Sequence, residues 1–200
     1  MKLIDAPLPP DCYKPEPRVV PVDTVVVHHI SALNWDKLAP DDHARLAAVG
    51  VTLPDLPPDE RKYHPDYCLA LLVAAKLSYH YLIDRAGQVY RLVPEHRVAW
   101  HAGVSKMPTD GREWVNSFSV GVTLTASHPM DDPEVAAGRV SGYTDEQYDA
   151  LAVLIGDLRS RHEVRYLVGH NEIAPGRKHD PSPLFDWSRF RNPVYSPLPA

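Results

Sequence analysis

The 200-residue sequence contains only two cysteines, Cys12 and Cys68. Two cysteines are too few for the disulfide framework of a small secreted domain, and their separation matches no zinc-ribbon spacing. We therefore expect both residues to be free thiols, with a single bridge between them as the alternative.

Long apolar runs and an excess of one charge are also missing. No apolar run approaches the ~20 residues of a membrane-spanning helix, and prolines interrupt residues 1–17 before a signal-peptide core can form. We expect a cytoplasmic protein, or a periplasmic or secreted one if a signal peptide has been removed. The net charge of −5, with both signs interspersed, argues against nucleic acid or an anionic membrane as a partner. The sequence leaves the oligomeric state open.

The length and the hydrophobic content of 44% suit one globular domain with a substantial core. The 21 prolines are about twice the usual share of roughly 5% and predict long ordered loops. Residues 1–22 are expected to form an extended arm and residues 23–200 the domain itself. Residues 31–66, the least regular stretch, are expected to form an insert within this domain.

Hydrophobic patterns predict a mixture of strands and helices. Strands are predicted at residues 24–27, 79–84, 88–92, 97–101, 117–125 and 165–168. Helices are predicted at residues 41–49, 69–76 and 187–190, and a surface loop at 126–142. The clearest helix begins after Thr144, which forms a capping-box pattern with Gln147. Because the elements do not alternate strictly, we predict an α/β fold, a single domain with a central mixed β-sheet flanked by helices.

The segment GHNEIAPGRKHDP, residues 169–181, carries the strongest chemical signal. His170 follows a predicted strand, and Asp180 lies in a loop stiffened by proline and glycine. An imidazole and a carboxylate are two of the three protein ligands of a catalytic zinc, whose fourth position stays open for water. Lys178 adds a positive charge between them. The alternative is a polar loop that only connects a strand to a helix.

His28 is the first candidate for the third ligand, because it ends the buried run at residues 24–27 and can point into a cleft at the edge of the sheet. Its neighbour His29 must face elsewhere, since successive side chains of a strand alternate between its faces. A hydrogen-bonded structural histidine is the alternative for His28.

Four segments occur in one order: VVVHHIS, SYHYLIDRAGQVYRLVPEHRVAWHAG, NSFSVGVTL and GHNEIAPGRKHDPSPLFDW. In this combination the sequence resembles the zinc-dependent N-acetylmuramoyl-L-alanine amidases, which include anhydro-muropeptide amidases, phage lysozyme-type amidases and peptidoglycan recognition proteins. The resemblance spans residues 23–190 and implies their fold, a Zn²⁺ cofactor, and peptidoglycan or a muropeptide as the substrate.

The resemblance also implies roles for individual residues. The zinc ligands of the family fall on His28, His170 and Asp180. The catalytic lysine falls on Lys178. Positions that line the substrate groove fall on Trp100, His101 and Asn116. For Trp100 the alternative is a ring that belongs to the hydrophobic core.

One position departs from the cytoplasmic members, whose strand SIGIEL carries a glutamate implicated in activating the zinc-bound water. This chain reads SVGVTL and has Thr123 there, and a threonine hydroxyl cannot act as a general base near neutral pH. Phage-type amidases and the catalytic recognition proteins lack that glutamate and carry a tyrosine in the pattern GYHF. SYHY places Tyr79 at this tyrosine, so the resemblance implies Tyr79 as a catalytic group. The alternative is a strand tyrosine that only packs its ring.

The implied reaction is zinc-dependent hydrolysis of the amide between N-acetylmuramic acid, or its anhydro form, and L-alanine. One alternative is a module that binds peptidoglycan fragments without cutting them, although such relatives usually lack a zinc ligand. Another is a zinc peptidase, although no HExxH helix is present. The choice between soluble muropeptide and polymeric cell wall remains open, as does the role of the insert at residues 31–66.

Overall fold

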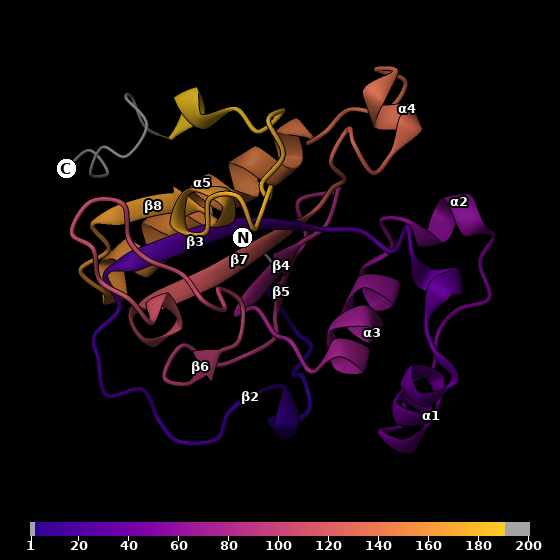
Figure 1. Ribbon diagram of the computed structural model, residues 1–200, viewed down its shortest axis with the longest axis horizontal. Helices are drawn as coiled ribbons and strands as arrows, with labels where there is room; N and C mark the ends of the chain where they lie inside the picture. Colours follow the sequence, from indigo (N-terminus) through magenta and orange to yellow (C-terminus); the bar gives the residue numbers. More distant parts are fainter. Residues whose placement is uncertain (1–2, 191–200) are drawn as a thin grey trace.

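The computed structural model describes residues 3–190 and is built around a six-stranded mixed sheet (Figure 1). In spatial order the strands are β1 (Leu3–Asp5), β5 (Val89–Arg91), β4 (Tyr81–Ile83), β7 (Ser119–Thr125), β3 (Thr24–Ile30) and β8 (Tyr166–Gly169). Only β4 and β5 run antiparallel, and the other neighbours are parallel. A separate antiparallel pair joins β2 (Tyr13–Lys14) to β6 (Val98–Ala99). The predicted α/β fold with a mixed sheet is confirmed.

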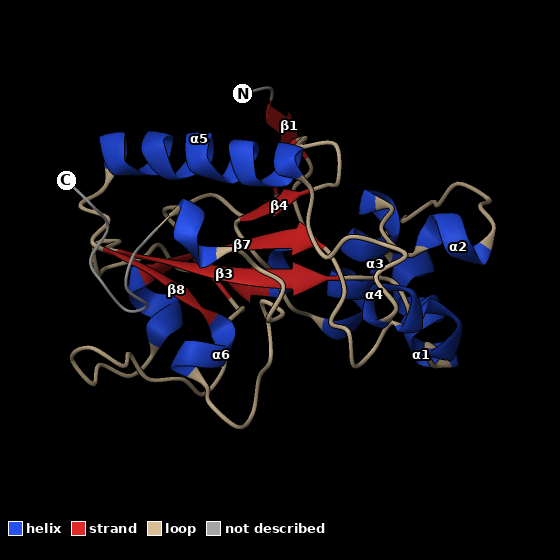
Figure 2. Cartoon of the chain, turned by 90° about the horizontal axis from the view of Figure 1, so that it is seen from above, coloured by secondary structure: helices blue, strands red, loops and turns tan. Residues whose placement is uncertain are grey.

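Helix α5, Asp145–Arg161, lies along one face of the sheet (Figure 2). Thr144 accepts a hydrogen bond from the Gln147 amide and Gln147 accepts one from the Thr144 amide, which confirms the predicted capping box. Apolar residues of α5 such as Leu151 and Leu158 pack against the β-branched residues of β3 and β7. No helix among residues 3–190 is both long and apolar enough to cross a membrane.

Helices α1 (Pro40–Ala48) and α2 (Pro58–Arg61) belong to the insert, and α3 (Pro65–Ala75) begins where the insert ends. All three lie beyond one end of the sheet (Figures 1 and 2). The Lys62 ammonium lies 2.6 Å from the buried Asp132 carboxylate and so ties the insert to helix α4, Pro133–Ala136. The surface loop expected at residues 126–142 therefore contains a short helix, capped by Asp132. Both cysteines are free and buried.

Several predicted boundaries were wrong. Strand β3 continues to Ile30 because it pairs with β7 along its whole length, so His28 lies inside the strand. Tyr79 precedes β4, and α3 begins at Pro65. The strand expected at 97–101 is limited to Val98–Ala99, the two residues that pair with β2. The strand expected at 117–125 starts at Ser119, because residues 115–118 form a 3-10 turn. The last part of the predicted domain, residues 191–200, lies outside the described residues.

The arm at the start of the chain is tied to the sheet by β1 and by a buried arginine. The Arg18 guanidinium donates hydrogen bonds to backbone carbonyls on the edge of the sheet, including those of Arg97, Ser117 and Ser119. Burial lowers the pKa of Arg18 to about 10, so it stays charged at neutral pH. The arm therefore packs against the loop that precedes β7.

Side-chain alternation on β3 and β7 determines which of their residues lie on the face of the sheet opposite α5. On β3, Val25 and Val27 pack in the core with α5, whereas Val26 belongs to a core cluster on the opposite side with Ile173. His28 shares the face of Val26, since residues two apart on a strand point the same way. His28 pairs with Thr123 in the register, so alternate residues of β7 lie on this face as well.

Two glycines with positive φ differ in the space around them, so substitutions at these positions distinguish backbone strain from a steric clash. Gly50 has φ of +75° and open space around it, whereas a Cβ on Gly87 at φ of +74° would lie 2.6 Å from the carbonyl oxygen of Glu146. We expect Gly50→Ala to lower the free energy of unfolding by about 1 kcal/mol through strain alone. Gly87→Ala should cost at least about 1 kcal/mol more, since overpacking is added. Urea unfolding of both variants checks this, and equal losses would contradict it.

Candidate active site

Two histidines and an aspartate converge at the edge of the sheet. His28 comes from β3, His170 is the first residue of helix α6 (His170–Ile173), and Asp180 lies in the loop that follows. The Asp180 Oδ2 atom lies 2.8 Å from His28 Nδ1 and 3.1 Å from His170 Nδ1. Both imidazoles are buried, and the carboxylate is 15% exposed. The structure thus brings together all three ligands predicted from the sequence.

A chain of hydrogen bonds fixes the proton positions on His28. The Ser119 hydroxyl donates to the Val115 carbonyl at 2.6 Å, so its oxygen accepts from His101 Nε2 at 3.1 Å. His101 Nδ1 is then an acceptor and faces His28 Nε2 at 3.0 Å. His28 Nε2 must therefore carry the proton, which leaves a lone pair on His28 Nδ1.

His170 is fixed in the same way by a single contact. Its Nε2 lies 3.1 Å from the Ala102 carbonyl oxygen, which can only accept a hydrogen bond. When the His170 ring is neutral, its proton therefore lies on Nε2, and the lone pair on Nδ1 points at Asp180.

Three acceptors therefore meet without a proton between them. Burial lowers the pKa of His28 to about 4 and holds that of His101 well below its usual range, so both rings are neutral at neutral pH. Two imidazole lone pairs and a carboxylate oxygen at these distances repel each other unless a cation lies among them. Their ligand atoms all lie within 4.8 Å of one another, which suits one divalent metal ion.

Glycine at position 121 makes room for this arrangement. A Cβ on Gly121 would lie 2.5 Å from the Cγ atom of His101, so a side chain here would displace the imidazole. Ser119, Gly121 and Thr123 alternate along β7 on the face of His28. Ser119 orients the His101 ring, and Gly121 leaves the space that this ring fills.

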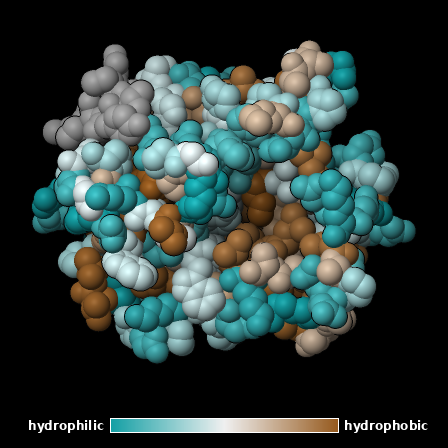
Figure 3. All heavy atoms as spheres, in the orientation of Figure 1, coloured by the Kyte–Doolittle hydropathy of each residue, from teal (hydrophilic) through white to brown (hydrophobic). Residues whose placement is uncertain are grey.

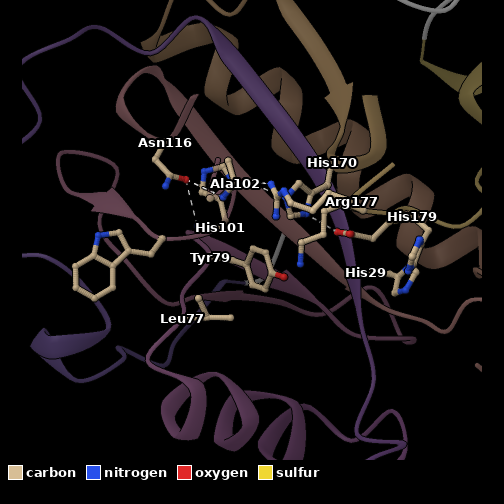
Figure 4. A pocket seen from close by; sticks show the side chains of 13 residues that line it. His29, Leu77, Tyr79, His101, Ala102, Asn116, His170, Arg177 and His179 are labelled. Carbon is tan, nitrogen blue, oxygen red and sulfur yellow. Dashed lines mark hydrogen bonds and ion pairs between the residues drawn. The ribbon is translucent and has the colours of Figure 1, made fainter. Parts of the chain in front are cut away.

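A pocket of about 490 Å³ opens beside these ligands (Figure 4). It lies between β3 and α3. Its wall includes seven of the eight predicted residues, all except His28: Tyr79, Trp100, His101, Asn116, His170, Lys178 and Asp180. The surface in Figure 3 is hollowed near its centre, with apolar residues inside and hydrophilic residues around the rim. The ligand cluster therefore borders space that a small molecule can enter.

Tyr79 and Thr123 lie next to His28. The Tyr79 and His28 rings are 4.7 Å apart, and Thr123 is the partner of His28 in the strand register. Burial, assisted by the charge of Asp180, raises the pKa of the Tyr79 phenol, so the hydroxyl stays protonated and can donate a hydrogen bond. The buried Thr123 hydroxyl lies near this phenol without a hydrogen bond of normal length to any described residue.

Positive charge reaches the pocket from the loop before Asp180. Lys178 lines the pocket, and its charge helps to lower the pKa of His28 after the larger effect of burial. Arg177 was not predicted as a site residue, although it stands in the quoted segment beside Lys178. Its guanidinium donates to the carbonyls of Ala102 at 2.8 Å and Val104 at 2.5 Å. Arg177 thereby holds the same carbonyl that orients His170.

The three residues expected to bind substrate differ in how much of each side chain remains available for a ligand. Trp100 is 37% exposed at the pocket wall and does not belong to the buried core. Asn116 uses its side-chain oxygen to accept from the His101 and Ala102 amides. His101 uses both ring nitrogens in the chain described above. A substrate contact by these three residues stays a prediction. Glu172, two residues after His170, accepts from the Gly169 amide.

Comparison with known proteins agrees with this geometry. Residues 18–183 match the family model described as N-acetylmuramoyl-L-alanine amidase. The chain is 39% identical over 130 residues to 1,6-anhydro-N-acetylmuramyl-L-alanine amidase AmpD of Citrobacter freundii, covering 64% of this chain and 62% of that protein. It is 32% identical over 134 residues to N-acetylmuramoyl-L-alanine amidase AmiD of Escherichia coli, covering 62% and 47% respectively. The alignments thus span less than two thirds of these relatives.

Solved structures show the same fold. The solution structure of Citrobacter freundii AmpD superposes with a TM-score of 0.56 at 33% identity, covering 96% of this chain and 90% of that chain. AmiD of Escherichia coli, solved with the substrate anhydro-N-acetylmuramic acid-L-Ala-D-γ-Glu-L-Lys, superposes with a TM-score of 0.51 at 24% identity, covering 84% and 55%. By its family match over most of its length, this chain belongs to the N-acetylmuramoyl-L-alanine amidase family.

Proposed function

We propose that the protein is a zinc-dependent amidase that cleaves the bond between N-acetylmuramic acid, in its anhydro form, and L-alanine. The observation that carries this proposal is the convergence of two imidazole lone pairs and a carboxylate beside an open pocket. The identity to AmpD, a 1,6-anhydro-N-acetylmuramyl-L-alanine amidase by name, supports the anhydro sugar as the substrate.

Zn²⁺ fits the donor set formed by His28, His170 and Asp180. Ligands of a tetrahedral zinc at about 2.0 Å lie about 3.3 Å apart, close to the 2.8 and 3.1 Å between Asp180 and the two imidazoles. Three protein ligands leave the fourth position open, which is typical of a catalytic rather than a structural zinc. When bound, the metal supplies a Lewis acid that polarises the scissile carbonyl and acidifies water.

The chain's own residues complete the chemistry around this position. The Tyr79 hydroxyl, protonated and next to His28, donates a hydrogen bond to the oxygen that becomes negative in the transition state. The Lys178 ammonium at the same pocket stabilises that charge. Trp100 presents an exposed ring at the wall against which the sugar or the first stem residue packs. Thr123 leaves the site without a carboxylate base on β7.

The remaining assignments follow from this function. Peptidoglycan fragments are the partner, and turnover of soluble muropeptides places the reaction in the cytoplasm. We assign residues 23–200 to the amidase domain, which includes the insert at residues 31–66. Residues 1–22 form an arm whose Arg18 is fixed beside β7.

Hydrolysis of a defined muropeptide is the direct test. We expect the zinc-loaded protein to convert anhydro-N-acetylmuramic acid–L-Ala peptides into free sugar and a peptide with a new L-alanine amino terminus, identified by mass spectrometry. His170→Ala should lose zinc and activity together. Binding without cleavage would indicate a recognition module, and cleavage between amino acids would indicate a peptidase. Faster release from intact sacculi than from soluble muropeptide would overturn the soluble substrate.

The tyrosine can be tested separately from the threonine. We expect Tyr79→Phe to lower kcat by about 10²-fold, because one hydrogen bond to the developing oxyanion is lost. Thr123→Val removes a buried hydroxyl without a normal hydrogen bond and should leave kcat within about threefold. Steady-state kinetics of both variants at equal zinc content check this. A silent Tyr79→Phe would show that another group stabilises the charge.

The chain of hydrogen bonds behind His28 predicts a change in metal affinity. Ser119→Ala removes the acceptor that orients His101, and we expect zinc affinity to fall about tenfold, as for outer-shell partners of other zinc sites. Ser127→Ala is a matched control, because Ser127 is also buried but takes no part in the hydrogen bonds between Val115, Ser119, His101 and His28. Competition with a chelator measures both affinities. Equal affinities in the two variants would contradict the role given to Ser119.

A further inference from the structure

Arg18 is a buried cation of the arm that lies beside the start of β7. Its guanidinium donates to four backbone carbonyls, those of Glu95 at 2.9 Å, Ser117 at 2.7 Å, Arg97 at 2.9 Å and Ser119 at 3.0 Å. The planar fork of an arginine satisfies several acceptors at once, whereas a lysine offers only a point charge. The guanidinium therefore joins the arm, the segment before β6 and the start of β7.

The burial of this cation carries a free-energy cost. Burial is the largest effect on the pKa of Arg18 and lowers it, so the surroundings disfavour the charged form. A buried charge is usually balanced by an opposite charge, but the four carbonyl partners here are neutral. The guanidinium therefore contributes mainly the positions of these carbonyls, and those of Ser117 and Ser119 belong to the segment that leads into the active site.

One connection runs from Arg18 through Ser119 to His28. The Ser119 carbonyl accepts a hydrogen bond from Arg18, and the Ser119 hydroxyl accepts one from His101 Nε2. The other ring nitrogen of His101 accepts from His28 Nε2 at 3.0 Å. Because the carbonyl and the hydroxyl belong to one residue, holding the Ser119 carbonyl also holds the hydroxyl that orients His101.

A second connection runs from Arg18 through Asn116 to His170. The Asn116 carbonyl lies 3.4 Å from Arg18 Nη1, and the carbonyl of the next residue, Ser117, accepts from the same nitrogen. The Asn116 side-chain oxygen accepts from the Ala102 amide at 2.8 Å, and the Ala102 carbonyl accepts from His170 Nε2. The same guanidinium therefore lies behind both imidazole ligands.

The rest of the molecule holds Arg18 in place. Its backbone amide donates to the His96 carbonyl at 2.7 Å, and the Glu95 carboxylate accepts from Arg161 of α5 at 2.7 Å. A pocket of about 340 Å³ opens beside these residues and is lined by Arg18, Val20, Glu95 and His96, among others. This pocket shares no residue with the active-site pocket, so a small solute can reach the position of Arg18 without entering the metal site.

We infer that Arg18 is a positioning residue of the metal centre, because its guanidinium fixes the backbone from which both imidazole ligands are oriented. It contacts neither the substrate nor the metal and acts through Ser119 and Asn116. The arm at residues 1–22 is thereby a part of the active site. This inference rests on the zinc site of the proposed function, but not on the reaction that takes place there.

Zinc affinity, measured by competition with a chelator, tests this role. We expect Arg18→Ala to lower the affinity at least about tenfold, as for residues that orient the ligands of other zinc sites, and to shift the visible absorption bands of the Co²⁺-substituted protein. Methylguanidinium, which fits the pocket beside Arg18, should reverse both changes in Arg18→Ala and alter neither property of the wild type. Arg18→Lys keeps the charge without the planar fork and should bind zinc more weakly than the wild type.

Arg112→Ala is the matched control for a general loss of stability. The Arg112 guanidinium pairs with Asp23 at 2.8 Å and lies 4.1 Å from the centre of the ring of Phe118, which directly precedes β7. Its removal should lower the midpoint of thermal unfolding but leave zinc affinity within about twofold, because Arg112 takes no part in the two connections. Arg18→Ala combined with Ser119→Ala should lower the affinity by less than the product of the two single effects, since both act on His101.

Three results would overturn the role of Arg18. The first is wild-type zinc affinity in Arg18→Ala or, if that variant does not fold, in Arg18→Lys. The second is a loss of affinity in Arg112→Ala as large as that in Arg18→Ala. The third is full additivity with Ser119→Ala. A wild type that binds zinc but cleaves no muropeptide would instead overturn the proposed function and leave this inference intact.

Discussion

The repulsion among His28, His170 and Asp180 is the constraint on which the rest of the site depends. Three acceptors at hydrogen-bond distance repel one another unless a cation lies among them, and the surrounding hydrogen bonds hold the proton of each neutral imidazole on the nitrogen that faces away from Asp180. Carbonyl groups fix both imidazoles, directly through Ala102 and indirectly through Val115. The backbone of the two loops thus determines the ligand atoms before any metal binds.

Strand β7 links the fold to this constraint. Its alternate residues Ser119, Gly121 and Thr123 face the site, while the residues between them fill the core under α5. A shift of one residue in the β3–β7 register would therefore turn the whole stripe into the core and expose its apolar residues. The hydrophobic pattern that stabilises the sheet also sets the position of His101 relative to His28. The fold and the candidate metal site consequently depend on the same register.

The sequence predicted the parts of the molecule that depend on local pattern or on a motif. The capping box at Thr144, the mixed sheet and the three converging residues are of this kind. It failed at the ends of β3 and α3, because strand pairing with β7 extended the first and Pro65, a favourable first helical residue, extended the second. The roles of Ser119 and Arg177 were missed, since each acts on a residue distant in the sequence through a backbone carbonyl. Alternation from Thr123 back along its strand was the available signal for Ser119.

Thr123 and Tyr79, which replace the glutamate of the cytoplasmic members, fit together in the pocket. A glutamate at position 123 would bring a second carboxylate next to His28 and the Tyr79 phenol, into a space that the phenol and a small hydroxyl now share. Threonine and tyrosine therefore form a compatible pair, in which a neutral donor replaces a charged base. In the proposed reaction, the absence of that base makes the transition state depend more on the metal, on Lys178 and on how accurately the substrate is held.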